Sequence, residues 1–249
     1  MGLLIHARRG DWGGAQLSDV EAVARSVADS FSGFDEDEAI EITLEPTPGE
    51  HDPPMTLSTI NRGRYVVRLN VRGNFWARLA YQFGHEYCHV LADPTTRTDR
   101  GDRFAWIEEA LCETGSLFAL RKMAELWAVA PPYPNWRAYA PSLAAYEAEH
   151  VSDPLRSLPN GVEFTDWLRE RMPLLEADAN RRDDNTIIAK EFLHAFESDR
   201  TAWRAVRCLH SAPRSSDASL AGFMNDWAEA CRLSPITPFP PIAVCRVAV

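Results

Sequence analysis

The sequence predicts an α+β protein, in which a half that mixes strands and helices precedes a mostly helical half. Three short stretches within residues 39–71 have the alternating or β-branched composition of strands. From residue 75 onward, apolar residues recur with helical spacing, interrupted by a segment rich in proline and aromatic residues after Pro131. Because the composition changes there, we expect an α+β domain over residues 1–130 and a helical region over residues 131–249.

The first expected helix covers residues 18–32, where Ser18 and Glu21 form a capping-box pattern. Next come strands at residues 39–45 and in "TLSTI" and "YVVRLNV", the last two joined by the turn "NRGR" as a hairpin. Two long helices are then expected over residues 75–91 and 103–129.

The second half begins with "PPYPNWRAYAP", which we expect to be irregular because of its prolines. Shorter helices should follow at residues 142–150, 162–176, 185–197, 200–210 and 217–232. Either Ser198 or Asp199 is expected to cap the helix over residues 200–210, since both can accept a backbone N–H.

Composition excludes several classes of function. The 249 residues are 45% hydrophobic and 25% charged, as in ordinary globular proteins, and carry a net charge of -10. Such an acidic chain is not expected to bind nucleic acid or an anionic membrane, because both require clustered positive charge. The chain has no apolar run of transmembrane length, and its start lacks the features of a signal peptide. Five cysteines without a CxxC pair favour reduced thiols and a cytoplasmic location.

The segment "YQFGHEYCHVLADP", residues 81–94, contains the pattern His-Glu-x-x-His. On a helix, His85 and His89 would lie about 40° apart around the axis and about 6 Å apart along it. Both imidazoles can therefore reach one metal ion, and Glu86 beside them can address a water on that ion. Gly84, inside the expected helix, indicates close approach of a strand, a substrate or a neighbouring side chain.

A catalytic zinc site needs a third protein ligand, and the second long helix offers one. Glu109 and Glu113 lie one turn apart in an apolar helix, where a buried carboxylate is costly unless it is paired or binds metal. Glu109 as a ligand removes this cost. Glu113 can accept the second N–H of a ligating histidine and fix its tautomer. Glu108 faces elsewhere and is expected to be partly buried.

"HEYCH", followed by nineteen residues, Glu109 and an acid four positions later, resembles the thermolysin-type zinc metallopeptidases, the gluzincins. "WIEEALCE" is similar to the W-[LI]-x-E segment of the related aminopeptidases, and the whole resemblance covers roughly residues 57–120. It implies a zincin-like first half in which His85, His89 and Glu109 bind Zn²⁺, Glu86 is the general base, and Glu113 stands where the family usually has Asp. It also implies that "YVVRLNV" is the edge strand that lines the cleft and pairs with an extended substrate.

The resemblance further implies a hydrolase, most simply a metallopeptidase acting on a peptide or protein. Members of the family add a Tyr or His, usually from the later domain, that stabilises the oxyanion. Tyr146 and His150, four residues apart on one expected helix, are the leading candidates here. The other candidates are Tyr133, Tyr139, His194 and His210.

Two other interpretations stay open from the residues alone. The chain can be a zinc-stabilised scaffold or regulatory protein without activity, although a purely structural site has no need of Glu86. It can also lack a metal altogether, with these polar residues forming a buried hydrogen-bond network. The residues do not indicate an oligomeric state.

Overall fold

The computed structural model describes residues 2–31, 39–59, 61, 63–93, 103–211, 219–234 and 236–238. It confirms an α+β protein with a small mixed sheet and many helices. The chain forms two compact units, one of Met1–Val90 with Gly115–Glu149, the other of Leu91–Thr114 with His150–Val249. This division differs from the expected boundary after residue 130. The part of the expected helical region that ends at Glu149 belongs to the first unit.

The first unit contains a four-stranded sheet in the order β1-β2-β4-β3. β1 (Leu4–Ala7), β2 (Glu41–Pro46) and β4 (Arg64–Leu69) are parallel neighbours, and β3 (Met55–Ser58) pairs antiparallel with β4. The expected hairpin of β3 and β4 is therefore confirmed. The expectation that "YVVRLNV" is the edge strand is wrong, because β4 lies inside the sheet and β3 forms that edge. β1, which the sequence pattern did not predict, forms the other edge.

The two faces of the sheet differ in polarity. Ile5, Ile42 and Tyr65 align across the strands on one face and are buried. The opposite face carries ion pairs, among them Arg64 with Glu41 at 3.0 Å. Because side chains alternate along a strand, this contrast fixes the register and directs one face toward the helices.

α1 (Leu17–Ser30) buries an apolar stripe that includes Val20, Val23 and Val27. The expected capping box is absent, because the N-cap is Gln16 and makes no side-chain cap. Glu21 instead accepts the backbone N–H of Ala7 at 2.8 Å. The Glu21 carboxylate, which the capping-box pattern assigned to the start of the helix, thus binds β1 instead.

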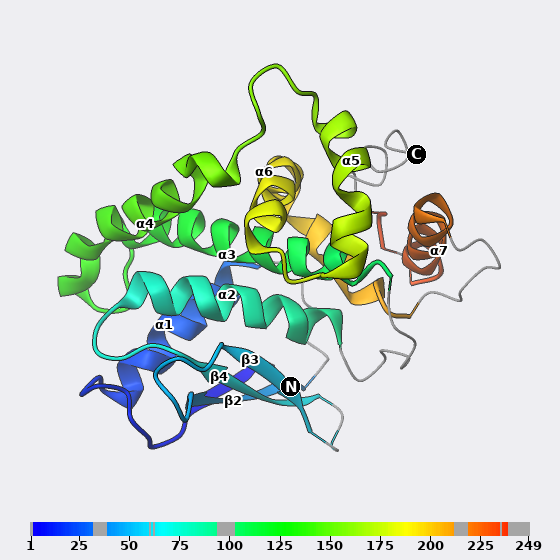
Figure 1. Ribbon diagram of the computed structural model, residues 1–249. Helices are drawn as coiled ribbons and strands as arrows, with labels where there is room; N and C mark the ends of the chain where they lie inside the picture. The colour runs from blue at the N-terminus through cyan, green and yellow to red at the C-terminus, as the bar shows by residue number, and fades with distance from the viewer. Residues whose placement is uncertain are drawn as a thin grey trace. The chain divides into compact units, whose positions relative to one another are not determined.

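α2 (Trp76–Ala92) and α3 (Ala105–Trp127) are the long helices that the sequence predicts. Figure 1 shows α2 between the sheet and α3. Gln82 holds α2 to the end of β4, accepting the N–H of Asn70 at 2.8 Å and donating to its carbonyl at 3.2 Å. Ser116 of α3 donates to the Tyr81 carbonyl at 2.8 Å. α2 is therefore fixed on both sides by side chains that satisfy backbone groups.

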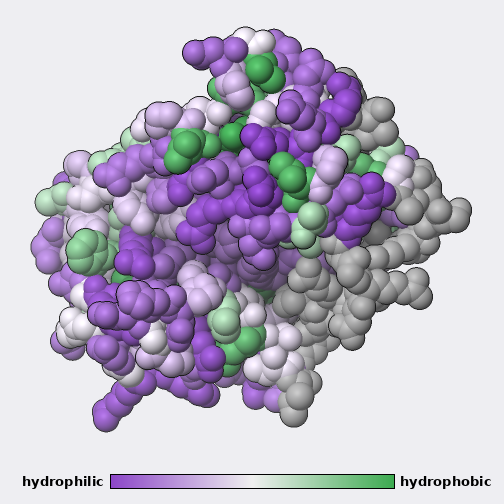
Figure 2. All heavy atoms as spheres, viewed as in Figure 1, coloured by the Kyte–Doolittle hydropathy of each residue, from purple (hydrophilic) through white to green (hydrophobic). Residues whose placement is uncertain are grey.

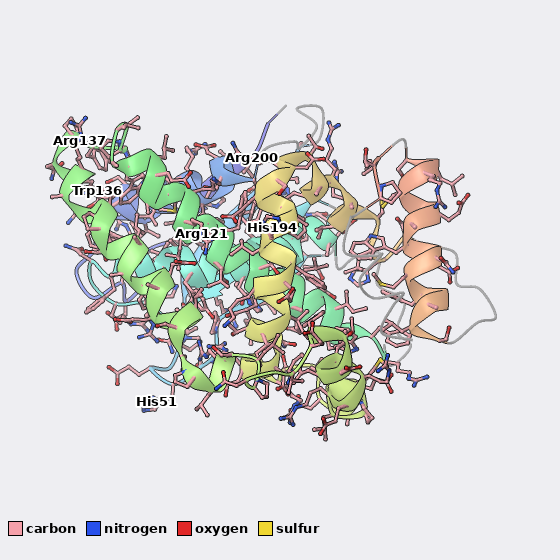
Figure 3. All side chains as sticks on the ribbon, turned by 90° about the horizontal axis from the view of Figure 1, so that it is seen from above. His51, Arg121, Trp136, Arg137, His194 and Arg200 are labelled. Carbon is pink, nitrogen blue, oxygen red and sulfur yellow. The ribbon has the colours of Figure 1, made fainter. Side chains whose placement is uncertain are left out.

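The proline-rich segment contains a 3-10 helix, η2 (Pro134–Tyr139), where we expected irregular chain. Trp136 (labelled in Figure 3) packs in an aromatic cluster, with ring centroids 5.3 Å from Trp76 and 5.1 Å from Trp127. α4 (Ala140–Ser152) follows directly and covers the expected helix at residues 142–150.

The second unit contains the expected helices as α5 (Phe164–Ala177), α6 (Arg182–Ser198) and α7 (Leu220–Leu233). Residues 200–208 form a 3-10 helix, η4 (Arg200–Cys208), so the expected helix at 200–210 has a tighter winding. α6 packs against η4 and against the short η3 (Pro154–Arg156), and α7 packs against η4. Phe196 and Trp203 stack at 3.8 Å between ring centroids at the first of these contacts.

The view in Figure 2 shows apolar residues as small, separate patches on a largely hydrophilic face. Within the described residues, no helix has both the length and the apolar character that crossing a bilayer requires. Four cysteines, Cys88, Cys112, Cys208 and Cys231, are free thiols and buried. The fifth, Cys245, lies outside the described residues.

Candidate metal centre

α2 presents His85 and His89 on one face, as their spacing predicts. The ring centroids are 5.2 Å apart and the rings cross at 70°. Both residues are only half-buried, whereas Phe83 and Tyr87 on the apolar side of the helix are buried. The pair is thus open to a ligand on a helix whose other side is packed.

Tyr87 belongs to the packed side of α2. Its ring lies 5.3 Å from that of Phe31 and 5.5 Å from that of Phe83. Burial raises the pKa of the Tyr87 phenol well above its usual range, and the nearby charge of Asp29 raises it further. The phenol therefore stays neutral at physiological pH, and its role is packing.

Glu86 differs from the two histidines because it is buried, with 3% of its surface exposed. Its carboxylate accepts a hydrogen bond from the Thr56 hydroxyl, 2.9 Å from Oε2, and the same hydroxyl lies 3.0 Å from the Glu86 carbonyl oxygen. Thr56 belongs to the edge strand β3. A buried carboxylate needs such a partner, since burying an unpaired charge is costly.

Gly84, in the middle of α2, lets α3 approach α2 closely. A Cβ at Gly84 would lie 3.0 Å from the carbonyl oxygen of Gly115, and a Cβ at Gly115 would lie 3.0 Å from that of Gly84. Backbone, and not a substrate or a strand, thus occupies the space beside Gly84. This approach brings the α3 backbone within reach of the helix turn that carries His85.

Three side chains of α2 and α3 form a set that can hold a metal ion. The ligand atoms of His85, His89 and Cys112 all lie within 4.8 Å of one another. Two imidazoles and a thiolate are ligands that zinc accepts. Cys112 is not among the ligands that the gluzincin resemblance implies. Its position three residues after Glu109, toward the same side of the helix, was the signal that could have identified it.

Glu109 lies on α3 one turn before Cys112 and is half-buried, less than the apolar sequence around it suggested. The set that the structure brings together contains Cys112 and not Glu109. The assignment of Glu109 as the third ligand stays a prediction.

Glu113, one turn after Glu109, is buried with 2% of its surface exposed. Its Oε1 accepts a hydrogen bond of 2.9 Å from the Thr186 hydroxyl of α6. This contact compensates for the burial of the carboxylate within the second unit. The expected role of Glu113, orienting a ligating histidine, stays a prediction.

Glu108 is buried with 3% exposed, whereas the sequence analysis expected it to be only partly buried. One partner that compensates for this burial is His210, whose Nε2 lies 3.1 Å from Glu108 Oε2, at hydrogen-bond distance. His210 follows η4, so this contact joins two segments of the second unit that are far apart in sequence. A single polar residue without a surrounding motif does not reveal such a partner in the sequence.

Tyr146 and His150, the leading candidates for stabilising an oxyanion, both lie on α4 and are half-buried. The ring of Tyr146 packs edge-on against that of Tyr81, with 5.9 Å between centroids. The Arg156 guanidinium donates to Nδ1 of His150, which leaves Nε2 as the nitrogen that carries the proton.

The remaining candidates also have identified surroundings. The Tyr139 hydroxyl accepts the Ala77 N–H at 3.2 Å, and Tyr133 packs edge-on against Trp136 with 4.8 Å between ring centroids. His194, labelled in Figure 3, is exposed on α6. The contacts described for Tyr133, Tyr139, Tyr146 and His150 are packing and hydrogen-bond contacts within the protein. They do not test a catalytic role.

Comparisons with protein-family models, with curated protein sequences and with solved structures found no match to this chain. The interpretation of the site therefore depends on its own residues.

Proposed function

We propose that the chain is a zinc-dependent hydrolase, and specifically a metallopeptidase of the cytoplasm. The observation that carries the proposal is the arrangement of α2, where two half-buried imidazoles share one face and the buried Glu86 carboxylate lies beside them. A helix stabilised only by packing has no need of a buried carboxylate at this position. The mixed sheet, its antiparallel strand β3 and the two long helices after it also support a zincin-like first unit.

The donor atoms fit zinc. His85 and His89 supply two imidazole nitrogens, and the third ligand comes from α3, as Glu109 by the resemblance or as Cys112 by proximity. Bound zinc would supply a polarising charge that acidifies water and activates a carbonyl group. Two imidazoles with a carboxylate keep one coordination position open, which hydrolysis requires.

Glu86 then has two tasks as the general base. Its carboxylate takes a proton from the attacking water, and the same group passes that proton to the leaving amine. The hydrogen bond from Thr56 to Oε2 keeps the carboxylate oriented. The substrate class that fits this chemistry is an amide, in a peptide or a protein.

A second function is favoured by one observation, the inclusion of Cys112 in the set of ligand atoms. If His85, His89, Cys112 and Glu109 all bind the ion, four protein ligands close its coordination, and no position is left for water. The chain would then be a zinc-stabilised scaffold.

Elemental analysis and a peptide-library digest of the purified chain test the proposal together. We expect equimolar zinc, lost in His85→Ala and His89→Ala, and cleavage that chelators abolish. Glu86→Gln should keep the zinc and lose cleavage. Glu149→Gln, at an exposed site on α4, controls for removal of a carboxylate.

The outcomes separate the functions. Zinc without cleavage in the wild-type chain supports the scaffold, and a metal-free wild type excludes both. Cleavage that persists in Glu86→Gln would show that another group is the base.

A further inference from the structure

Thr56 is half-buried on the edge strand β3, at the end of an apolar row that crosses the sheet. It pairs with Val67 of β4, which pairs with Leu44 of β2, so the three side chains form one row on the buried face. Val67 and Leu44 are fully buried. Valine has nearly the shape of threonine and would continue this row, so the hydroxyl of Thr56 is the feature that packing does not explain.

The Thr56 hydroxyl reaches two oxygens of Glu86, Oε2 at 2.9 Å and the backbone carbonyl at 3.0 Å. A hydroxyl has one proton to donate and can also accept. A carboxylate oxygen is a stronger acceptor than a backbone carbonyl, and Oε2 is also the nearer of the two, so the hydroxyl donates to Oε2. The contact therefore ties one oxygen of the Glu86 carboxylate to the edge strand.

We propose that Thr56 is a positioning residue whose hydroxyl anchors Oε2 of Glu86 to the edge strand, so that the carboxylate is held in one orientation with Oε1 toward the substrate. The proposal rests on the hydrolase function proposed above. Among the described residues, the side-chain group that bonds to Glu86 is the Thr56 hydroxyl. It contacts Oε2 and the backbone carbonyl oxygen, and it does not contact Oε1. Gln82, one turn earlier, fixes the same face of α2 to β4, so the strand and the helix cannot easily shift.

The kinetic test uses Thr56→Val, which keeps the shape and removes the hydroxyl, and Thr56→Ser, which keeps the hydroxyl. We expect Thr56→Val to lower kcat roughly ten- to a hundredfold with KM and zinc content unchanged. Thr56→Ser should restore most of the rate. Ser58→Ala, an exposed hydroxyl on the same face of β3, is the matched control and should leave kcat unchanged.

A second measurement needs no activity. A double-mutant cycle of Thr56→Val and Glu86→Ala in equilibrium unfolding of the zinc-loaded chain should show a coupling of roughly tenfold in the unfolding equilibrium constant. Additive effects would overturn the proposal whatever the activity. Coupling with an unchanged kcat in Thr56→Val, or equal losses in the Val and Ser variants, would also overturn it. Coupling in a chain that cleaves no peptide would leave Thr56 as the anchor of Glu86 and refute the hydrolase function instead.

Discussion

Gly84 of α2 and Gly115 of α3 face each other so closely that neither tolerates a side chain without movement. A Cβ on either glycine would lie 3.0 Å from the carbonyl oxygen of the other. Backbone atoms form this contact, and they cannot rotate away as the end of a side chain can. The distance between the two helices is therefore set by backbone atoms at this point.

Gly84→Ala should destabilise the protein, although alanine favours a helix over glycine by about 1 kcal/mol. We expect a loss of about 1–3 kcal/mol in the free energy of unfolding, because overpacking displaces α2 from α3. Zinc affinity should fall as well. Equilibrium unfolding and competition with a chelator measure the two effects. A gain in stability near the helix-propensity value would show that the contact is not tight.

The third ligand can be identified by replacing zinc with cobalt. We expect Glu109→Gln to lose both metal and cleavage, and Cys112→Ser to keep both. A thiolate ligand produces a charge-transfer absorption with cobalt that a carboxylate does not. Such a band in the wild-type chain, absent in Cys112→Ser, would contradict the carboxylate assignment and support the closed scaffold site.

Breaking the buried pair of Glu108 and His210 should be costly. His210→Phe removes a hydrogen-bond partner of the buried Glu108 carboxyl group, so we expect a loss of about 1–3 kcal/mol in the free energy of unfolding. Replacing both residues, as Glu108→Leu with His210→Phe, should recover much of this loss, because the buried acceptor is removed together with its donor. Additive losses in the double variant would mean that the two residues act independently.

Asp199 caps η4, and its effect should depend on pH. Its carboxylate accepts the Thr201 hydroxyl at 2.7 Å and the Thr201 N–H at 2.9 Å, and these hydrogen bonds lower the pKa of Asp199 below its usual value. A lowered pKa in the folded state stabilises the protein above the unfolded-state pKa, and the stabilisation is lost as pH falls through the folded-state pKa. Asp199→Ala should therefore cost about 1 kcal/mol at neutral pH and little in strong acid.

Ser198→Ala is the control for the cap, since the sequence pattern allowed either residue. The Ser198 hydroxyl donates to the His194 carbonyl of its own helix and does not cap η4. Unfolding experiments at neutral and acidic pH should show a small effect that does not change with pH. An effect of Ser198→Ala as large as that of Asp199→Ala would refute the assignment of the cap.

Local periodicity was sufficient to predict the helices and most strands. α2 and α3 appear within two residues of their expected bounds, because a two-faced or long apolar pattern specifies a helix without reference to distant segments. β1 was missed, since a strand of four residues has no periodic signal of its own and is defined by pairing with β2. The edge position of β3 was missed for the same reason, because strand order is a property of the assembled sheet.

The sequence by itself determined that His85, Glu86 and His89 would share one helix turn, because helix geometry converts a spacing of four residues into proximity. Only the tertiary structure decided their surroundings. It brought Thr56 of a separate strand to Glu86, Cys112 to the histidines and His210 to Glu108. Each of these contacts joins residues that are distant in sequence, and the packing of buried surfaces and the pairing of buried polar groups select them, which no local pattern encodes.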